Sequence, residues 1–148
     1  TYEWGYTYGP PMAVAPINEV RRVLNYAVTA IPRQKILMGI PNYGYVWTLP
    51  YQQGTAARTI SNPGAVDLAW QVRAAIQYDT KAQSPFYNYY DSNGRQHEVW
   101  FEDARSIEAK LRLANEFRVG GVSYWTIGTY FPQNWLVLNS LFNVRKVL

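Results

Sequence analysis

Residues 16–41, PINEVRRVLNYAVTAIPRQKILMGIP, decide the fold because a helical pattern is followed closely by a buried-strand pattern. Apolar residues recur at helical spacing over 16–30, and the Ile-Pro pair that follows ends the pattern. Residues 35–41 form a short apolar run closed by a proline, as in a strand buried on both faces of a parallel sheet. With a further strand predicted at 1–4, the segment predicts a strand–helix–strand unit of parallel type.

The rest of the chain predicts an antiparallel segment and then a return to the parallel pattern. The antiparallel segment comprises one helix and three short strands, predicted at 61–73, 76–79, 84–91 and 96–103. The helix has Val66, Ala69 and Trp70 on one side, and Ser-Asn-Gly at 92–94 is a strong hairpin signal. The parallel pattern resumes with a helix from Asp103 or Ser106 to Phe117, a strand at 121–128 and a helix at 134–142.

These elements amount to three βα units of parallel type interrupted by a small α+β segment. Three units are compatible with a small open sheet. They are equally compatible with part of a (β/α)8 barrel, because a whole barrel needs about 250 residues and this chain has 148.

Composition and charge argue against several functional classes. The chain has no Cys and one His, His97, which excludes thiolate metal sites and metal sites with several His ligands. A Ser-His-Asp triad would have to use His97, which lies in a predicted hairpin. The net charge is +4, but no run of Lys or Arg exceeds two residues, which argues against nucleic-acid binding and leaves attraction to an acidic wall polymer open. No apolar stretch approaches the ~20 residues of a membrane span. We expect no metal, cofactor or membrane span.

Aromatic residues point to a ligand surface. Aromatic residues make up 16% of the chain, and most of them are Tyr (13) or Trp (6). The side chains of Tyr and Trp combine an apolar ring face with a polar N–H or O–H group. They follow each predicted parallel strand, at 2–4, 42–47 and 124–125. The carboxyl ends of parallel strands meet at one edge, where barrels carry their active sites. Packing is the better explanation for any single Trp after a strand, but three such strand ends together predict an aromatic-walled cleft suited to sugar rings.

Four stretches, taken together and in order, resemble the C-terminal part of the family 18 glycoside hydrolases, the chitinase-like family: 1–17, 35–47, 84–106 and 120–128. The most similar branch is that of bacterial spore cortex-lytic and germination N-acetylglucosaminidases. The resemblance implies an α/β fold that holds the last three βα units of a (β/α)8 TIM barrel, with an α+β insertion between the seventh and eighth units. The implied divisions are 1–47 for units six and seven, 48–102 for the insertion, and 103–148 for the remaining helix, strand and helix.

The resemblance also implies roles for individual residues. Tyr2 matches the Tyr of a Met-x-Tyr-Asp motif and would hydrogen-bond the substrate's N-acetyl carbonyl, while Glu3 replaces the motif's Asp and would contact the same sugar. Tyr43 and Tyr45 would line the cleft, and Trp125 would form its floor. The insertion would supply a wall of the groove, from Tyr87, Tyr89, Trp100, Phe101 and Glu102.

The family's mechanism is substrate-assisted: one protein acid protonates the glycosidic oxygen, and the substrate's acetamide is the nucleophile. That acid ends an Asp-x-x-Asp-x-Glu motif, which starts at no Asp of this chain. Glu102-Asp103, the only adjacent carboxylates, are better explained by helix capping. We expect an inactive fragment of an enzyme that cleaves N-acetylglucosaminyl bonds in spore-cortex peptidoglycan or chitin-like glycans, acting outside the cytoplasm in the spore or cell wall.

Two other readings stay open. The chain could be a non-catalytic carbohydrate-binding module that uses the same aromatic residues. It could also be an interaction protein, because an incomplete barrel leaves sheet edges unpaired, and unpaired edges favour self-association.

Overall fold

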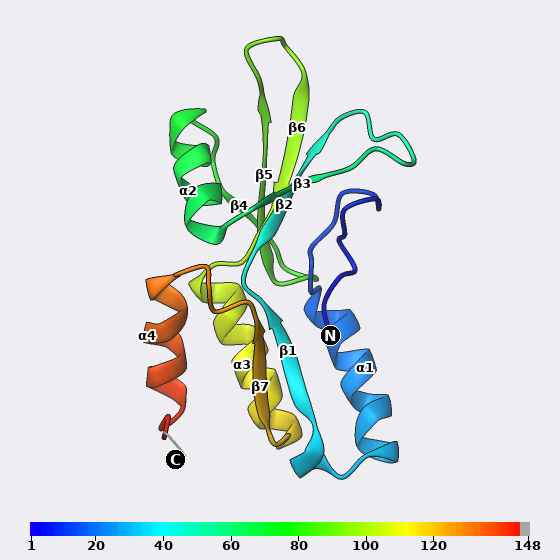
Figure 1. Cartoon of the computed structure of the whole chain (residues 1–148), viewed down its shortest axis with the longest axis vertical. Coiled ribbons are helices and arrows are strands. Elements are labelled where there is room, and N and C mark those ends of the chain that lie inside the picture. Colours follow the sequence, from blue (N-terminus) through cyan, green and yellow to red (C-terminus); the bar gives the residue numbers. More distant parts are fainter. Residues whose placement is uncertain (146–148) are drawn as a thin grey trace.

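The structure is a computed structural model that describes residues 1–145. It is a mixed α/β fold with two sheets and no closed barrel among the described residues (Figure 1). A parallel pair joins β1 (Leu37–Pro41) to β7 (Gly121–Trp125). A five-stranded antiparallel sheet has the order β3-β2-β6-β5-β4. Its strands are β2 (Gly44–Thr48), β3 (Arg58–Ile60), β4 (Gln77–Asp79), β5 (Ser84–Tyr90) and β6 (Gln96–Trp100).

Four α-helices surround the sheets in the described part of the chain: α1 (Ile17–Ala30), α2 (Asn62–Gln71), α3 (Ala104–Phe117) and α4 (Pro132–Leu141). A short 3-10 helix, Arg33–Lys35, leads into β1. Helices α1, α3 and α4 run alongside the parallel pair, whereas α2 lies against the antiparallel sheet (Figure 1). No helix within residues 1–145 combines the length and the apolar character needed to cross a bilayer.

The core of the parallel half follows from the patterns of α1, β1 and α3. Val20 and Leu24 on α1 are buried against Met38 and Ile40 of β1. On the other face Leu37, at the start of the strand, is 63% exposed, whereas Pro41 at its end is buried. The expected burial of this strand therefore fails at its first residue, and one face of the strand packs on helices.

Helix α3 begins where the sequence indicates. Asp103 is the N-cap and accepts hydrogen bonds from the backbone N–H groups of Arg105 and Ser106, while the Ser106 hydroxyl accepts one from the Asp103 N–H. This reciprocal arrangement is a capping box, which satisfies backbone donors that a helix start leaves free. Arg118 ends the helix in the left-handed conformation, with φ 52°.

The antiparallel sheet buries both of its faces. On one face, Val46, Tyr87 and Val99 pack against Ala65 and Ala69 of α2. On the other face, aromatic side chains pack against the loop that precedes α1; this cluster contains Ala13, Val14, Tyr45, Trp47 and Trp100. The Trp47 indole donates a hydrogen bond to the Gly9 carbonyl at 2.8 Å, which ties that loop to the sheet.

The structure corrects three expectations. Residues 1–4 form no strand; the Trp4 and Gly5 N–H groups donate instead to carbonyls of the loop before α1. Strands β2 and β3 were not predicted. Helix α2 buries Ala65 and Ala69, whereas Trp70 is 85% exposed.

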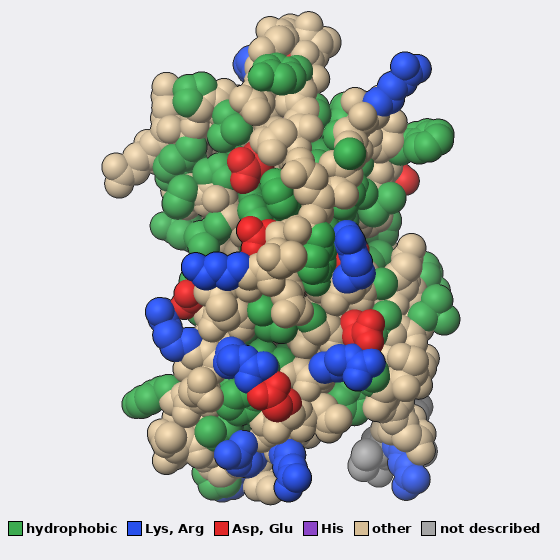
Figure 2. Space-filling model, turned by 180° about the vertical axis from the view of Figure 1, so that it is seen from behind, with side chains coloured by type: hydrophobic (Ala, Val, Ile, Leu, Met, Phe, Trp, Pro, Cys, Tyr) green, Lys and Arg blue, Asp and Glu red, His purple; other side chains and the backbone are tan. Residues whose placement is uncertain are grey.

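Charged side chains are scattered over the surface. Figure 2 shows Lys and Arg side chains interspersed with Asp and Glu on the face that it presents. Several of them form exposed ion pairs, such as Arg112 with Glu108 on α3 and Arg21 of α1 with Glu116 of α3. Exposed pairs of this kind contribute about 0–1 kcal/mol each, so they do little to hold the helices together.

Candidate functional site

The candidate site lies at the carboxyl ends of β1 and β7. In the parallel register Pro41 pairs with Trp125, so Tyr43 follows two residues after the partner of Trp125. The first residues of the chain reach the same region, because Tyr2 and Thr1 lie against Gly39 of β1. We call Tyr2, Glu3, Tyr43 and Trp125 the strand-end site.

Glu3 and Tyr43 are in direct contact. The Tyr43 hydroxyl donates a hydrogen bond to Glu3 Oε1 at 3.3 Å. Burial raises the pKa of Tyr43, and the neighbouring Tyr45 and Glu3 raise it further, so the phenol keeps its proton and remains a donor. Glu3 has φ 69°, a left-handed conformation that non-glycine residues rarely adopt. Such conformations concentrate at functional sites, so the backbone of Glu3 is consistent with a functional role for its side chain.

Tyr2 depends on a glycine. A Cβ atom at Gly39 would lie 2.5 Å from the Tyr2 ring, so the ring rests directly on the β1 backbone. The Thr1 hydroxyl donates to the Gly39 carbonyl at 3.0 Å, which fixes the same segment. The Tyr2 ring and the Thr1 hydroxyl therefore lie on the face of β1 that carries Gly39.

Trp125 presents an open aromatic face, since it is 60% exposed. Its backbone is held tightly: the Asn42 N–H donates to the Trp125 carbonyl at 2.8 Å. The Asn42 side-chain amide donates to the Thr126 carbonyl at 2.9 Å and to the Thr129 carbonyl at 2.7 Å. An exposed indole on a fixed backbone has the form of a stacking platform for a flat apolar ligand face.

Tyr45 and Trp100 lie beneath the strand-end site and are mostly buried, at 5% and 9% exposed. They are partners in the register of β2 and β6, and the Tyr45 ring meets the Tyr43 ring edge-on at 5.5 Å between centroids. Trp100 stacks on Phe86 at 4.7 Å and donates its indole N–H to Glu98. Their position supports Tyr43 from below, with little face left free for a ligand.

Tyr89 lies away from the other predicted residues. Side chains alternate between the faces of a strand, and Tyr89 and Tyr87 pack with the α2 cluster, opposite the cluster that holds Trp100. The Tyr89 ring stacks on His97 at 4.8 Å. Tyr87 and Phe101, predicted as groove wall, are 0% and 2% exposed and belong to the core instead.

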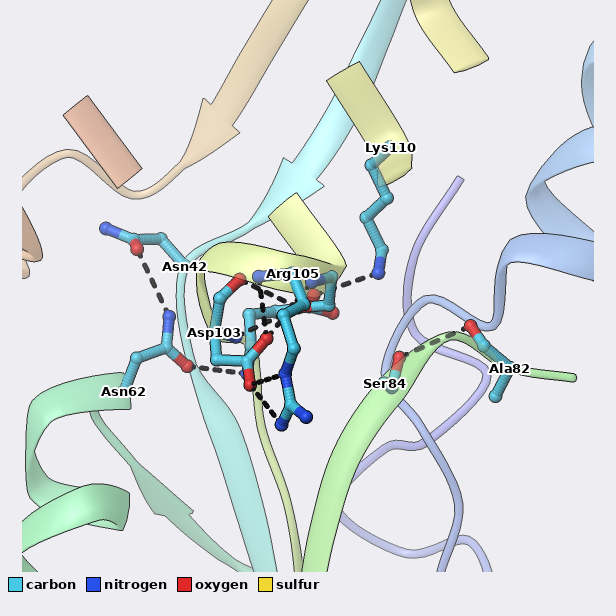
Figure 3. Close-up of polar contacts among 9 residues, drawn as sticks. Asn42, Asn62, Ala82, Ser84, Asp103, Arg105 and Lys110 are labelled. Atoms are coloured by element: carbon cyan, nitrogen blue, oxygen red, sulfur yellow. Dashed lines mark hydrogen bonds and ion pairs between the residues drawn. The ribbon is translucent and has the colours of Figure 1, made fainter. Parts of the chain in front are cut away.

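Glu102 is also buried, at 0% exposed, and so lines no groove. Its carboxylate Oε2 pairs with the Lys110 ammonium at 2.8 Å. Burial raises the pKa of Glu102, an effect that Lys110 opposes. Helix capping, expected of the Glu102-Asp103 pair, is confirmed for Asp103, which is drawn in Figure 3. Glu102 forms an internal ion pair instead.

Asn42 and Asn62 are the functional candidates that the sequence reasoning missed. Asn42 lies in the stretch 42–47 expected after a parallel strand, and Asn62 lies in the helix predicted at 61–73. They are 1% and 0% exposed and hydrogen-bonded to each other. A buried amide needs partners, but nothing local in the sequence indicates that either residue is buried. Within residues 1–145, no group of three His, Cys, Asp or Glu side chains is arranged to hold a metal ion.

Comparison with known proteins gives consistent results. The family model for glycosyl hydrolases family 18 matches residues 7–129. The cortical fragment-lytic enzyme of Bacillus subtilis is 56% identical over 147 residues, which cover 99% of this chain and 34% of that protein. The chain therefore spans about a third of the length of the curated relatives it matches.

Solved structures agree with this result. The Bacillus cereus spore cortex-lytic enzyme SleL superposes with a TM-score of 0.96 at 52% identity, over 99% of this chain and 34% of that chain. A chitinase from Chromobacterium violaceum superposes with a TM-score of 0.87 at 30% identity, over 97% of this chain and 44% of that chain. Both are longer proteins, to which this chain is similar over part of their length.

Proposed function

Because the chain belongs to the glycosyl hydrolases family 18, we propose that it supplies the substrate-positioning side of a glycosidase site for N-acetylglucosaminyl bonds. The observation that carries the proposal is the contact of Glu3 with Tyr43, which follows β1, together with the exposed indole of Trp125 at the end of the paired strand β7. The substrate class follows the names of the relatives, which include cortical fragment-lytic enzymes and chitinases. We propose spore-cortex peptidoglycan as the first candidate substrate and chitin-like glycans as the second.

Each residue of the strand-end site has a proposed role. Trp125 provides a flat apolar surface for one sugar ring, and Tyr2 donates to the N-acetyl carbonyl as that group attacks the anomeric carbon. Glu3 accepts a hydrogen bond from the same sugar, with its carboxylate oriented by the Tyr43 phenol. Tyr45 and Trp100 act indirectly, by holding Tyr43 from below.

We propose that the 148-residue chain by itself does not hydrolyse glycans. A retaining, substrate-assisted reaction needs one protein acid, and the Asp-x-x-Asp-x-Glu motif that carries it in this family is absent from these 148 residues. General acid catalysis contributes roughly 10²–10⁴-fold, and no carboxylate of the strand-end site other than Glu3 could replace it. Glu3 is instead engaged by Tyr43.

The proposed architecture is the last three βα units of a (β/α)8 barrel, with units six and seven over 1–47, an insertion over 48–102 and the final elements over 103–148. The parallel pairing of β1 with β7 through α3 supports it, as does the placement of Tyr2 against β1. Residues 146–148 of the last division lie outside the described residues. The proposed location is the spore or the cell wall, outside the cytoplasm, by analogy with the cortex-lytic relatives.

A titration of the chain with tetra-N-acetylchitotetraose, followed by calorimetry, tests the proposal. Trp125→Ala is expected to weaken binding by about tenfold or more, which corresponds to ~1.4 kcal/mol. Trp70→Ala is the matched control, because Trp70 is 85% exposed on α2 and lies outside the strand-end site. Equal losses in the two variants, or no binding by the unmodified chain, would exclude a glycan role for this site. Product release from cortex fragments would disprove the proposed inactivity.

An interaction role is the second candidate, and one observation favours it. Among the described residues β7 pairs with β1 alone, and Trp125, Ile127 and Tyr130 on and beyond that strand are 60–70% exposed. An unpaired strand edge beside exposed apolar groups favours association with a second copy of the chain. Light scattering after size exclusion tests this: a concentration-dependent dimer supports self-association, and a monomer throughout excludes it. Binding of glycan without turnover by the complete protein would identify a carbohydrate-binding module instead.

A further inference from the structure

Two buried asparagines connect the antiparallel sheet to the end of β7. Asn42 lies between β1 and β2, and Asn62 is the first residue of α2. The Asn62 amide donates to Asn42 Oδ1 at 3.3 Å, and the two side chains point toward each other in Figure 3. Both residues are essentially inaccessible to solvent, at 1% and 0% exposed. Neither belongs to the strand-end site.

Asn42 uses its whole side-chain amide. Its two donors go to the carbonyls of Thr126 and Thr129, and its oxygen accepts from Asn62. With the backbone bond from the Asn42 N–H to the Trp125 carbonyl, three carbonyl contacts, at Trp125, Thr126 and Thr129, fix the segment that leaves β7. A flipped amide would place an oxygen against two carbonyl oxygens, so one orientation is required.

Asn62 selects that orientation. Its own oxygen accepts the Glu102 N–H at 2.9 Å, which directs its amide nitrogen at Asn42. Glu102 is in turn fixed by the buried pair with Lys110. The contacts therefore run from the β6–α3 junction through Asn62 and Asn42 to the backbone carbonyls of Trp125 and of the segment that follows it.

We propose that Asn42 is a positioning residue that sets the orientation of the Trp125 indole, and that Asn62 acts through Asn42. The inference rests on the proposed function only in assigning a glycan to Trp125. Asn42 itself is buried beneath the segment and contacts backbone carbonyls, so it touches no ligand. Through these two side-chain amides, the antiparallel half of the molecule influences the proposed glycan-binding surface although neither Asn contacts the glycan.

Fluorine NMR of the chain labelled with 5-fluorotryptophan tests the inference. Six signals are expected from the six Trp residues, and Trp125→Phe and Trp47→Phe assign two of them. Asn42→Asp keeps the side-chain shape but replaces the amide donors with a carboxylate. The Trp125 signal should shift or broaden in the free variant, while the signal of Trp47, which is 1% exposed, stays in place. Asn25→Asp, at an exposed position of α1, is the matched control.

Asn62→Asp provides the second arm, because it retains an acceptor for the Glu102 N–H and removes the donor to Asn42. It should shift the same Trp125 signal by a smaller amount. Each variant should weaken binding of tetra-N-acetylchitotetraose, by roughly tenfold for Asn42→Asp, the effect expected of one or two lost hydrogen bonds. If Asn42→Asp also displaces the Trp47 signal, that variant has an altered fold. The positioning role is then tested by the Trp125 signal of Asn62→Asp alone.

The outcomes separate the inference from the proposed function. An unchanged Trp125 signal in the folded variants would overturn the positioning role, whatever the glycan does. A Trp125 signal that responds to Asn42→Asp but not to glycan in the unmodified chain would support the positioning role and reject the proposed function. A response to both, with weakened binding in the variants and none in Asn25→Asp, supports both.

Discussion

Replacing Lys110 with methionine removes one partner of the buried ion pair between the β6–α3 junction and α3. Lys110 Nζ lies 2.8 Å from Glu102 Oε2, and the side chains are 1% and 0% exposed. The second carboxylate oxygen, Oε1, has no hydrogen-bond partner among the described residues. The carboxylate therefore depends on Lys110 for most of its compensation, and the variant leaves a buried charge behind.

The separation sets the scale of the effect. Unit charges 2.8 Å apart attract with about 6 kcal/mol at an effective dielectric constant of about 20. Part of that attraction offsets desolvation, so we expect Lys110→Met to lower the free energy of unfolding by roughly 3–5 kcal/mol. Glu102→Met combined with Lys110→Met removes both charges and should return stability to within about 1 kcal/mol of the unmodified chain.

The pH dependence gives a second measurement. Burial raises the pKa of Glu102 above its usual 4.5, and Lys110→Met removes the largest of the interactions that oppose that shift, leaving only the one with Ser106. A carboxyl whose pKa is higher in the folded state binds more protons there than in the unfolded state, so its stability falls as pH rises. The Lys110→Met variant should lose stability as the pH is raised from 4.5 through the folded pKa, and the double variant should not.

Urea denaturation followed by Trp fluorescence at several pH values measures these quantities. Lys35→Met, at an exposed position, is the control for removing a positive charge. A loss below about 1 kcal/mol in Lys110→Met would refute the reasoning, since breaking a buried pair is expected to cost several times more. So would a double variant whose loss equals the sum of the two single losses.

Three further predictions concern single contacts. Tyr87→Phe removes the hydroxyl's 2.7 Å bond to the α2 backbone and should lower the free energy of unfolding by about 1–2 kcal/mol in thermal denaturation. The backbone N–H of Arg95 and other donors hold the pKa of Asp91 well below its usual 3.8. The ionised Asp91 therefore stabilises the hairpin above pH 3.8, and this stabilisation is lost as the pH falls through the pKa of the folded state. Asp91→Asn should reduce the hydrogen-exchange protection of the Arg95 amide at neutral pH. Gly39→Ala would place a Cβ 2.5 Å from the Tyr2 ring and should weaken glycan binding while preserving the helical circular dichroism signal.

Local signals were sufficient for the elements whose start or period lies in neighbouring residues. The helical spacing over 16–30 corresponds to α1, and the capping signal at Asp103 corresponds to the start of α3. The Ser-Asn-Gly turn at 92–94 joins β5 to β6 as expected. These features depend on residues within a few positions of each other, so the sequence contains what is needed to predict them.

Features that depend on distant partners were not predictable in the same way. Strand β2 pairs with β6, about fifty positions later, and its aromatic residues were read as a loop after a strand. The register of β5 with β6 pairs Trp100 with Phe86, so Tyr89 and Trp100 face opposite sides of the sheet. A shift of one residue in that register would reverse every side chain. The segment at 1–4 has the composition of a strand, but in the described chain its contacts to β1 are the Thr1 hydroxyl and the Tyr2 ring.

The route of the chain between the two sheets has a consequence for variation. Two residues, 42 and 43, separate β1 from β2, and residues 101–103 separate β6 from α3. Tyr45 pairs with Trp100, so the two ends of the segment between them lie next to each other in the structure. Its outer turns can change length at small cost in chain entropy. We therefore expect a relative's segment, grafted between these two crossings, to preserve the amide protection of β1 and β7 while altering the surface that surrounds Trp125.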